Sequence, residues 1–257
     1  MLTAQGIPAF EDNYIWLIRH PGRPQVAIVD PGDAEPVLAV MAAEGLEPVA
    51  ILITHHHYDH VGGIGDLLAR YPVPVYGPAR ETIPHLSHPV AEGDEVHIGA
   101  LDAHFRVMDV PGHTSGHVAY VGHGMLFCGD VLFTGGSGRL FEGTPEQMQN
   151  SLRRIRDLPD ETQVYCAHEY TEANLRFARI AEPDNAALMQ RQRETTTLRA
   201  AGRPTVPAPL GLEKATNPFL RFDQASLVRA AEAYARRPLS TDAQVYAVVR
   251  NWKDSLD

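Results

Sequence analysis

The sequence of 257 residues has only two cysteines, Cys128 and Cys166, and they are not spaced like a metal-binding pair. A disulfide framework is therefore not indicated, and a reducing cytoplasm is the simplest setting for the chain. Because a cysteine outside a disulfide usually packs as a small hydrophobic side chain, we expect both to lie buried in strands.

Long apolar runs, internal repeats and low-complexity tracts are also missing from the sequence. No run approaches the roughly 20 apolar residues that a membrane-spanning helix needs. Residues 1–6 contain no basic segment followed by an apolar one, so we expect neither membrane attachment nor a secretory signal. With 44% hydrophobic and 21% charged residues, the composition is typical of a soluble protein with one large domain, or with a domain and a smaller lobe.

Basic residues are scarce in the first two thirds of the chain. The net charge is −10, and residues 1–170 hold 9 Lys and Arg against 22 Asp and Glu. A nucleic-acid groove needs a basic stripe, so we expect no nucleic-acid partner. Residues 171–257 hold 13 basic against 10 acidic residues. We interpret most of this basic tail as solvated helical surface, with a few cations available for an anionic ligand.

The sequence is rich in histidine at one point, the run Thr54-His55-His56-His57-Tyr58-Asp59-His60. The apolar residues 49–53 before it predict a buried strand, and the glycines of residues 61–65 after it allow a tight turn. Side chains two residues apart in an extended chain point the same way, so His55 and His57 should converge and His56 should point elsewhere. Imidazole and carboxylate ligands suit zinc, iron or manganese.

Three later strands predicted from apolar runs also end in a metal-binding type of residue. His113 lies in the turn Pro111–His117, Asp130 follows the apolar run 125–129, and His168 follows the run 163–167. We expect His117 to orient a ligand or a turn rather than to bind metal. Seven ligands are enough to coordinate two adjacent ions if one carboxylate binds both. The seven candidates are His55, His57, Asp59, His60, His113, Asp130 and His168.

The same periodicities predict the remaining elements. Besides those already named, the expected strands are 14–18, 26–29, 73–76 at a sheet edge, 96–98 and 104–110. The expected helices are 34–45, 66–71, one that begins with the capping-box pattern at Thr144, 172–181, 185–200, 223–236 and 242–253. Residues 78–95 and 203–218 are expected to be loops, and a lobe boundary is expected near residue 171.

These motifs resemble the metallo-β-lactamase superfamily, whose metal signature matches residues 54–60, and within it the glyoxalase II (hydroxyacylglutathione hydrolase) family. The stretch Gly136–Thr144 and the helical tail carry the resemblance to glyoxalase II. The likeness extends over most of the chain, through residues 12–14, 111–117, 129–130, 166–170 and 217–221.

The resemblance implies an α+β fold: a four-layer αββα sandwich with a C-terminal helical lobe. Residues 1–170 would form the catalytic domain and residues 171–257 the glutathione-binding lobe. The family pattern assigns His55, His57 and His113 to one ion, Asp59, His60 and His168 to the other, and Asp130 to both. The ions would be two divalent metals, zinc by preference, with iron or manganese as alternatives.

The family substrate is S-D-lactoylglutathione, which is hydrolysed to D-lactate and glutathione in methylglyoxal detoxification. Water on such ions has a pKa lowered to about 7 and can attack the thioester carbonyl, with Asp59 orienting it. The resemblance places glutathione contacts at Arg139, Phe141, Tyr170, Arg250 and Lys253. Phe141 has no hydroxyl where eukaryotic members have a tyrosine, and Arg250 and Lys253 have the alternative role of plain surface cations.

Other functions stay open at this stage. A lactonase or a β-lactamase uses the same scaffold, and a mononuclear iron oxygenase acting on glutathione persulfide would use only the first histidine set. A non-catalytic metal-stabilised binding module is a fourth possibility, although structural zinc sites are usually rich in cysteine. We expect a cytoplasmic monomer whose partner is a small glutathione thioester.

Overall fold

The computed structural model describes residues 1–256. The chain divides into two compact units. Unit 1 consists of residues 1–109 and 115–129, and unit 2 of residues 110–114 and everything from residue 130 onward. None of the helices within residues 1–256 is long and apolar enough to cross a bilayer.

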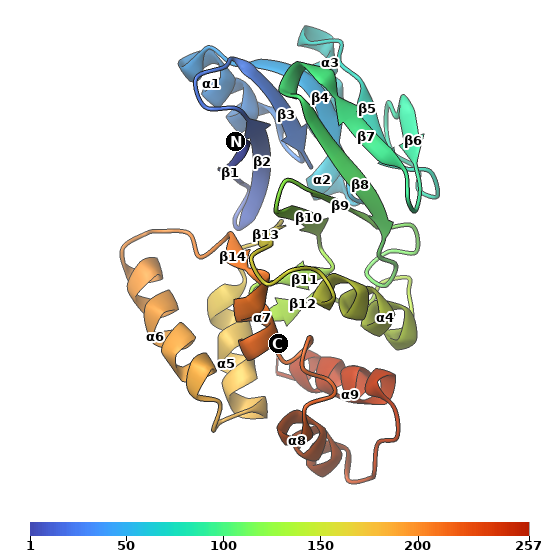
Figure 1. Ribbon diagram of the computed structural model, residues 1–257, viewed down its shortest axis with the longest axis vertical. Coiled ribbons are helices and arrows are strands. Elements are labelled where there is room, and N and C mark those ends of the chain that lie inside the picture. Colours follow the sequence, from blue (N-terminus) through green and yellow to red (C-terminus); the bar gives the residue numbers. More distant parts are fainter. Residues whose placement is uncertain (257) are drawn as a thin grey trace. The chain divides into compact units, whose positions relative to one another are not determined.

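The first sheet of unit 1 has six strands in chain order (Figure 1). β1 to β3 are antiparallel, and β3 to β6 are parallel. The strands are β1 (Thr3–Ala9), β2 (Asn13–Arg19), β3 (Gln25–Val29), β4 (Glu47–Leu52), β5 (Val75–Pro78) and β6 (His88–Val90).

Three helices connect the parallel strands: α1 (Ala34–Glu44), α2 (Tyr58–Val61) and α3 (Ile64–Arg70). α1 begins where the Asp33 carboxylate accepts a hydrogen bond from the Glu35 amide, and it ends at Gly45, whose φ of 65° is left-handed. Val37 and Met41 of α1 and Leu67 of α3 pack into one core with inward residues of the sheet. The helices therefore bury one face of the sheet, as β-α-β connections require.

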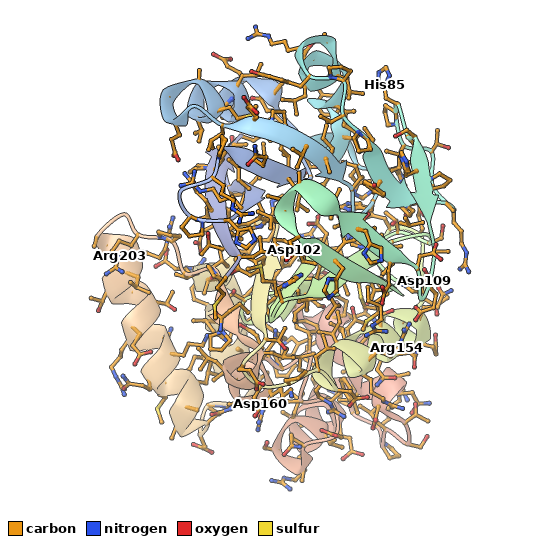
Figure 2. The ribbon with its side chains drawn as sticks, turned by 45° about the horizontal axis from the view of Figure 1, so that its top comes forward. His85, Asp102, Asp109, Arg154, Asp160 and Arg203 are labelled. Carbon is orange, nitrogen blue, oxygen red and sulfur yellow. The ribbon has the colours of Figure 1, made fainter. Side chains whose placement is uncertain are left out.

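The second sheet segment of unit 1 is an antiparallel meander of four strands with a short 3-10 turn, η1. Tyr120 is fully buried and donates a hydrogen bond to the Ile53 carbonyl at 2.8 Å, which ties the meander to the end of β4. Asp102, at a left-handed φ of 47°, ends η1 (Figure 2). The elements are β7 (Glu95–Ile98), η1 (Gly99–Leu101), β8 (Ala103–Asp109), β9 (Val118–Gly122) and β10 (Met125–Gly129).

Unit 2 is mainly helical. The predicted capping box at Thr144 is confirmed: its side chain accepts from the Gln147 amide, and the Gln147 side chain accepts in return. The elements are β11 (Leu132–Phe133), β12 (Gly136–Ser137), α4 (Pro145–Arg156), β13 (Gln163–Cys166), α5 (Thr171–Ala181), α6 (Ala186–Ala200), β14 (Ala208–Pro209), α7 (Leu210–Thr216), α8 (Ala225–Ala235) and α9 (Asp242–Asp254).

The expected loop at 203–218 is wrong, because it contains β14 and the whole of α7. Glu213 of α7 is fully buried and pairs with the buried Arg191. Glu213 also accepts hydrogen bonds from the Gly135 amide and the Asn217 side chain. The helix therefore buries polar residues that are hydrogen-bonded to other buried groups. Because its buried face is partly polar, the sequence shows no apolar stripe that would predict a helix.

Two expectations about the β5–β6 region are also wrong. β5 is not an edge strand, since it pairs with both β4 and β6. Pro74 lies before the strand, so its missing N–H removes no ladder bond, and its carbonyl accepts from the Ile51 amide at 2.9 Å. The expected loop at 78–95 contains β6 and the start of β7, while His85, between these strands and β5, is exposed (Figure 2).

Candidate metal centre

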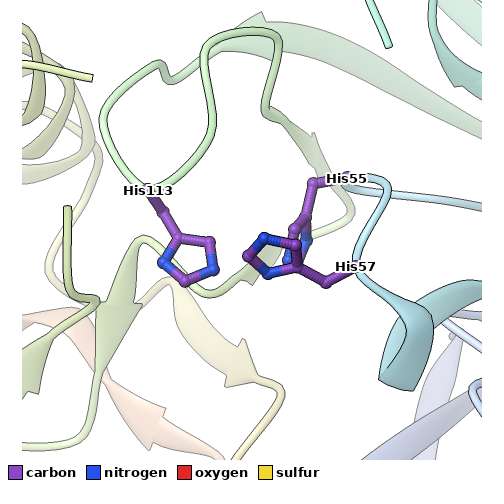
Figure 3. Close-up of side chains that lie close together, drawn as sticks. All are labelled: His55, His57 and His113. Carbon is purple, nitrogen blue, oxygen red and sulfur yellow. The ribbon is translucent and has the colours of Figure 1, made fainter. Parts of the chain in front are cut away.

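The first cluster of candidate ligands, His55, His57, Asp59 and His60, lies in unit 1 directly after β4. The rings of His55 and His57 lie 4.7 Å apart between centroids, nearly perpendicular (Figure 3). The ring of His60 lies 4.1 Å from that of His55. The expected convergence of His55 and His57 is therefore found, and His56 instead bonds to Glu81 at 2.9 Å.

Two close backbone contacts fix the turn that follows. His57 is extended, and α2 begins at the next residue, so Asp59 and His60 lie in its first turn. A Cβ placed on Gly32 would lie 1.8 Å from the Asp59 carbonyl oxygen, and one on Gly62 would lie 2.6 Å from the Gly32 carbonyl oxygen. Only glycine fits where these backbones cross, so the turn that presents the cluster depends on both residues.

Asp30, at the end of β3, organises the first cluster, and it is not among the predicted site residues. Its buried carboxylate accepts from the Thr54 amide at 2.8 Å and the Thr54 hydroxyl at 2.7 Å. It also contacts His60 Nδ1 at 3.0 Å. This contact leaves Nε2 of His60 as the ring atom that could bind a metal, the arrangement common for metal-bound histidine. The available sequence signal was another acid directly after a buried strand.

Asn13 and His117 are further neighbours of the first cluster within unit 1. The buried Asn13 side chain donates to Asp59 Oδ2 at 2.9 Å. His117 is fully buried and stacks on His55, with centroids 4.5 Å apart and planes at 17°. The expectation that His117 orients a ligand stays a prediction, and its stacking on His55 supports that role.

The second cluster, His113, Asp130 and His168, lies in unit 2. Asp130 Oδ2 lies 3.5 Å from His113 Nε2 and 3.4 Å from His168 Nε2. The other ring nitrogen of His113 contacts the Arg139 carbonyl oxygen at 2.9 Å. Asp130 is therefore the common neighbour of both histidines, and their Nε2 atoms face it.

The spacing of ligand atoms tests whether metal fits these clusters. In the first cluster, His60 Nε2 lies 3.6 Å from Asp59 Oδ2, and the two pairs in the second cluster are 3.4 and 3.5 Å apart. These distances exceed an ordinary N–H···O bond of about 2.7–3.2 Å. Two atoms bound tetrahedrally to one zinc ion at about 2.0–2.1 Å would lie roughly 3.3 Å apart. Within each unit, the donors and their spacing fit divalent metal.

Backbone contacts hold His113 in place. Its carbonyl oxygen accepts from the amides of Phe141 and Glu142 at 3.2 and 3.3 Å. A Cβ on Gly138 would lie 1.9 Å from the Asp130 carbonyl oxygen. The glycine-rich stretch that begins at Gly136 therefore wraps closely around two candidate ligands, and its glycine at 138 is required by that approach.

The two cysteines lie outside the candidate metal-ligand groups that residues 1–256 form. Cys128 and Cys166 are both buried strand thiols, as expected. Burial raises the pKa of Cys166 to about 12. Cys166 is therefore a protonated thiol at neutral pH, and no cysteine joins the candidate metal-ligand groups formed within residues 1–256.

The candidate glutathione contacts fall into two sets. Phe141 and Tyr170 are 65% and 37% exposed, the Arg139 side chain is 58% exposed, and Tyr170 stacks on His168. Arg250 and Lys253 on α9 are only 2% and 8% exposed.

Arg250 is therefore not a plain surface cation. Its guanidinium donates to the Ser137 carbonyl oxygen at 2.9 Å and to Asp254 Oδ1 at 2.8 Å. It also lies over the ring of Phe219. Asp254 Oδ1 is 3.8 Å from Arg139 as well, so one carboxylate faces two of the candidate cations.

Both halves of the chain match models of known protein families. Residues 9–168 match the family model described as "Metallo-beta-lactamase superfamily", and residues 169–256 match "Hydroxyacylglutathione hydrolase C-terminus". The chain is 55% identical to the hydroxyacylglutathione hydrolase of Alkalilimnicola ehrlichii over 99% of both chains. It is 49% identical to that of Nitrosomonas europaea over 100% of this chain and 97% of the relative.

A solved structure extends the likeness to the fold. The structure of TTHA1623 in a di-iron-bound form is 28% identical, with a TM-score of 0.59 over 83% of this chain and 98% of that one. The predicted α+β metallo-β-lactamase fold is thereby confirmed. Both family models and the full-length relatives lead to one assignment: the chain belongs to the hydroxyacylglutathione hydrolase family of the metallo-β-lactamase superfamily.

Proposed function

We propose that this chain hydrolyses S-D-lactoylglutathione, and related S-2-hydroxyacylglutathiones, to a 2-hydroxy acid and glutathione. The observation that carries this proposal is the identity of about half of all residues, across the full chain, with relatives named hydroxyacylglutathione hydrolase. The match of residues 169–256 to the C-terminal model of that family supports the glutathione thioester as substrate.

The seven ligands of the two clusters are proposed to hold two divalent ions. His55, His57 and His113 would bind one ion, Asp59, His60 and His168 the other, and Asp130 would bridge them. The ligand spacing within each cluster supports this assignment. The di-iron form of TTHA1623 supports the count of two. Zinc is the proposed metal, with iron or manganese as alternatives, because imidazole and carboxylate ligands suit all three.

Divalent ions at this centre would lower the pKa of bound water toward 7 and so make a nucleophile available at neutral pH. The side chains of the protein control orientation. Asn13 holds the Asp59 carboxylate at 2.9 Å, which leaves Asp59 placed to orient the attacking water. Asp30 fixes the tautomer of His60 through Nδ1. The thiolate of glutathione is a good leaving group, so little acid assistance is needed at the sulfur.

We assign substrate positioning to exposed and buried groups of unit 2. The exposed Arg139 and Tyr170, with Phe141, would contact the tripeptide, and Arg250 and Lys253 would face its carboxylates. Such contacts fix the scissile bond rather than perform chemistry. Residues 1–170 would then form the catalytic domain and residues 171–257 the glutathione lobe. A cytoplasmic monomer is the proposed form of the enzyme, and its two buried thiols are compatible with a reducing compartment.

Hydrolysis of S-D-lactoylglutathione by the purified protein, with metal content measured on the same sample, tests this function. Loss of thioester and release of one thiol per turnover, with close to two metals per chain, is the expected result. A protein that carries both metals and leaves the thioester intact would contradict the substrate assignment. A protein that carries one iron and consumes glutathione persulfide would instead favour the oxygenase.

A further inference from the structure

Glu81, in the segment between β5 and β6, reaches a position between two loops that carry candidate ligands. Its side chain is only 2% exposed. One carboxylate oxygen lies 2.9 Å from His56 Nδ1, and the other accepts a hydrogen bond from the Gly116 amide at 3.1 Å. All three residues belong to unit 1. Both carboxylate oxygens are thus engaged, each by a different loop.

The fit between Glu81 and Gly116 is close. A Cβ at Gly116 would lie 2.5 Å from Glu81 Cγ and 3.1 Å from Arg80 Cβ. The backbone of Gly116 is not in the left-handed region. The glycine is therefore needed for space rather than for conformation, and the space it leaves is occupied by the Glu81 side chain.

The partners of Glu81 lie beside candidate ligands in the sequence. His56 stands between His55 and His57, and Gly116 lies three residues after His113. The two loops also meet through a backbone bond from the Val118 amide to the Thr54 carbonyl at 3.0 Å. Glu81 adds a side-chain link, which joins the His56 ring of one loop to the Gly116 amide of the other.

We propose that Glu81 is a positioning residue of the metal centre: through His56 and Gly116 it fixes the loop from which His55 and His57 project. The inference rests on the proposed metal function of those histidines. A buried carboxylate is costly unless it is hydrogen-bonded, so its retention among these donors is explained if it holds the ligand loop in one conformation. Removing partners that orient metal ligands typically costs 10–100-fold in metal affinity or activity.

The test compares Glu81→Gln with the same substitution at an exposed glutamate that also faces a histidine. Glutamine has one accepting oxygen and no charge, so it cannot accept hydrogen bonds from both the Gly116 amide and His56 Nδ1 as the carboxylate does. Glu95→Gln is the control, because Glu95 also faces a histidine, His97 at 3.3 Å, but both side chains are more than half exposed. Zinc affinity is measured by chelator competition, and ligand geometry by the visible spectrum of the cobalt-substituted protein.

The expected result for Glu81→Gln is a loss of about 10–100-fold in zinc affinity, an altered cobalt spectrum and a lower kcat with KM little changed. The Glu95→Gln control should keep all four properties. Gly116→Ala approaches the same contact from the other loop by displacing Glu81 Cγ, and it should shift affinity in the same direction. If Glu81→Gln does not fold, the zinc affinity of Gly116→Ala tests the proposal instead.

Parent zinc affinity and an unchanged cobalt spectrum in folded Glu81→Gln would overturn the proposal, as would equal losses in the control. A parent protein that binds two metals but does not hydrolyse the thioester would remove the proposed substrate and leave the affinity comparison decisive. A parent that binds no metal would overturn both proposals.

Discussion

The two ligand clusters are held in different ways. In unit 1, His55, His57, Asp59 and His60 come from one stretch of six residues, and buried polar side chains from other segments support them. In unit 2, the three ligands come from three separate strand ends, and the contact that orients His113 is a backbone carbonyl. The geometry of the first cluster therefore depends on supporting side chains, which a substitution can remove. The geometry of the second depends on the backbone around it and on its glycines.

The largest expected effect comes from removing a carboxylate ligand from either cluster. Asp59→Ala and Asp130→Ala should each lower kcat by more than about 100-fold, beyond the range typical of outer partners, and should reduce bound metal. Because Asp130 is the proposed bridge, its loss should cost more metal than that of Asp59. Turnover and metal content of the purified variants are measured together, with the exposed Asp66 of α3 changed to alanine as control. Unchanged turnover in a folded variant would remove that residue from the mechanism.

The next largest effect on zinc affinity distinguishes support of the ligands by side chains from support by the backbone. Asp30→Asn weakens the contact to His60, so zinc affinity should fall by about 10–100-fold. Arg139→Ala leaves in place the carbonyl that contacts His113, so zinc affinity should stay at the parent value while KM rises. Chelator competition and steady-state kinetics on both variants provide the measurement. A large loss of zinc affinity in Arg139→Ala would show that the second cluster also relies on side chains.

This difference also explains what the sequence could predict. The first cluster is readable because all its members lie within six residues after an apolar strand. His113, Asp130 and His168 are recognisable as strand-end residues, and that recurrence adds them to the candidate ligands, but the division of the seven between two ions came from the family resemblance. Asp30 and Glu81 were missed because a lone acid in a turn or loop has the same local pattern whether it caps a turn or supports a ligand.

The fold was predictable where apolar periodicity governs it, and not where buried polar groups replace it. α1, α4 and α9 begin where the sequence predicts them, α4 through its capping box at Thr144. α7 was missed because part of its buried face is Glu213, which is neutralised by Arg191 from another helix. This ion pair joins residues of two different helices, so a local sequence pattern cannot predict it.

A smaller effect is expected at the substrate lobe. Asp254 faces both Arg250 and Arg139 and so competes with an anionic ligand for them. Asp254→Asn should lower KM for the glutathione thioester by about two- to fivefold, the range of a partly exposed ion pair, with kcat unchanged. Lys253→Ala should raise KM instead. Equal KM values in parent and both variants would contradict the assignment of α9 to substrate binding.

The smallest effect lies in unit 1 outside both clusters, at His123. Burial lowers the pKa of His123, and the neighbouring His104 lowers it further. In the folded protein, its Nε2 accepts a hydrogen bond from the His104 amide at 3.1 Å, and its φ is 54°. As pH falls below the ordinary value of 6.5, the unfolded chain takes up a proton before the folded one, so His123 should reduce stability progressively.

His123→Asn removes this titration with a residue that tolerates a left-handed backbone. Thermal unfolding at pH 7.5, 6.5 and 5.5 should show that the parent loses more stability than the variant as pH falls, with a Tm difference of at most about 2–4 °C. The two proteins differ only at this residue, so the difference between their curves isolates His123. His97→Asn, at a histidine more than half exposed, should follow the parent curve. Parallel curves for parent and His123→Asn would mean that the His123 imidazole is protonated as readily in the folded protein as in the unfolded chain.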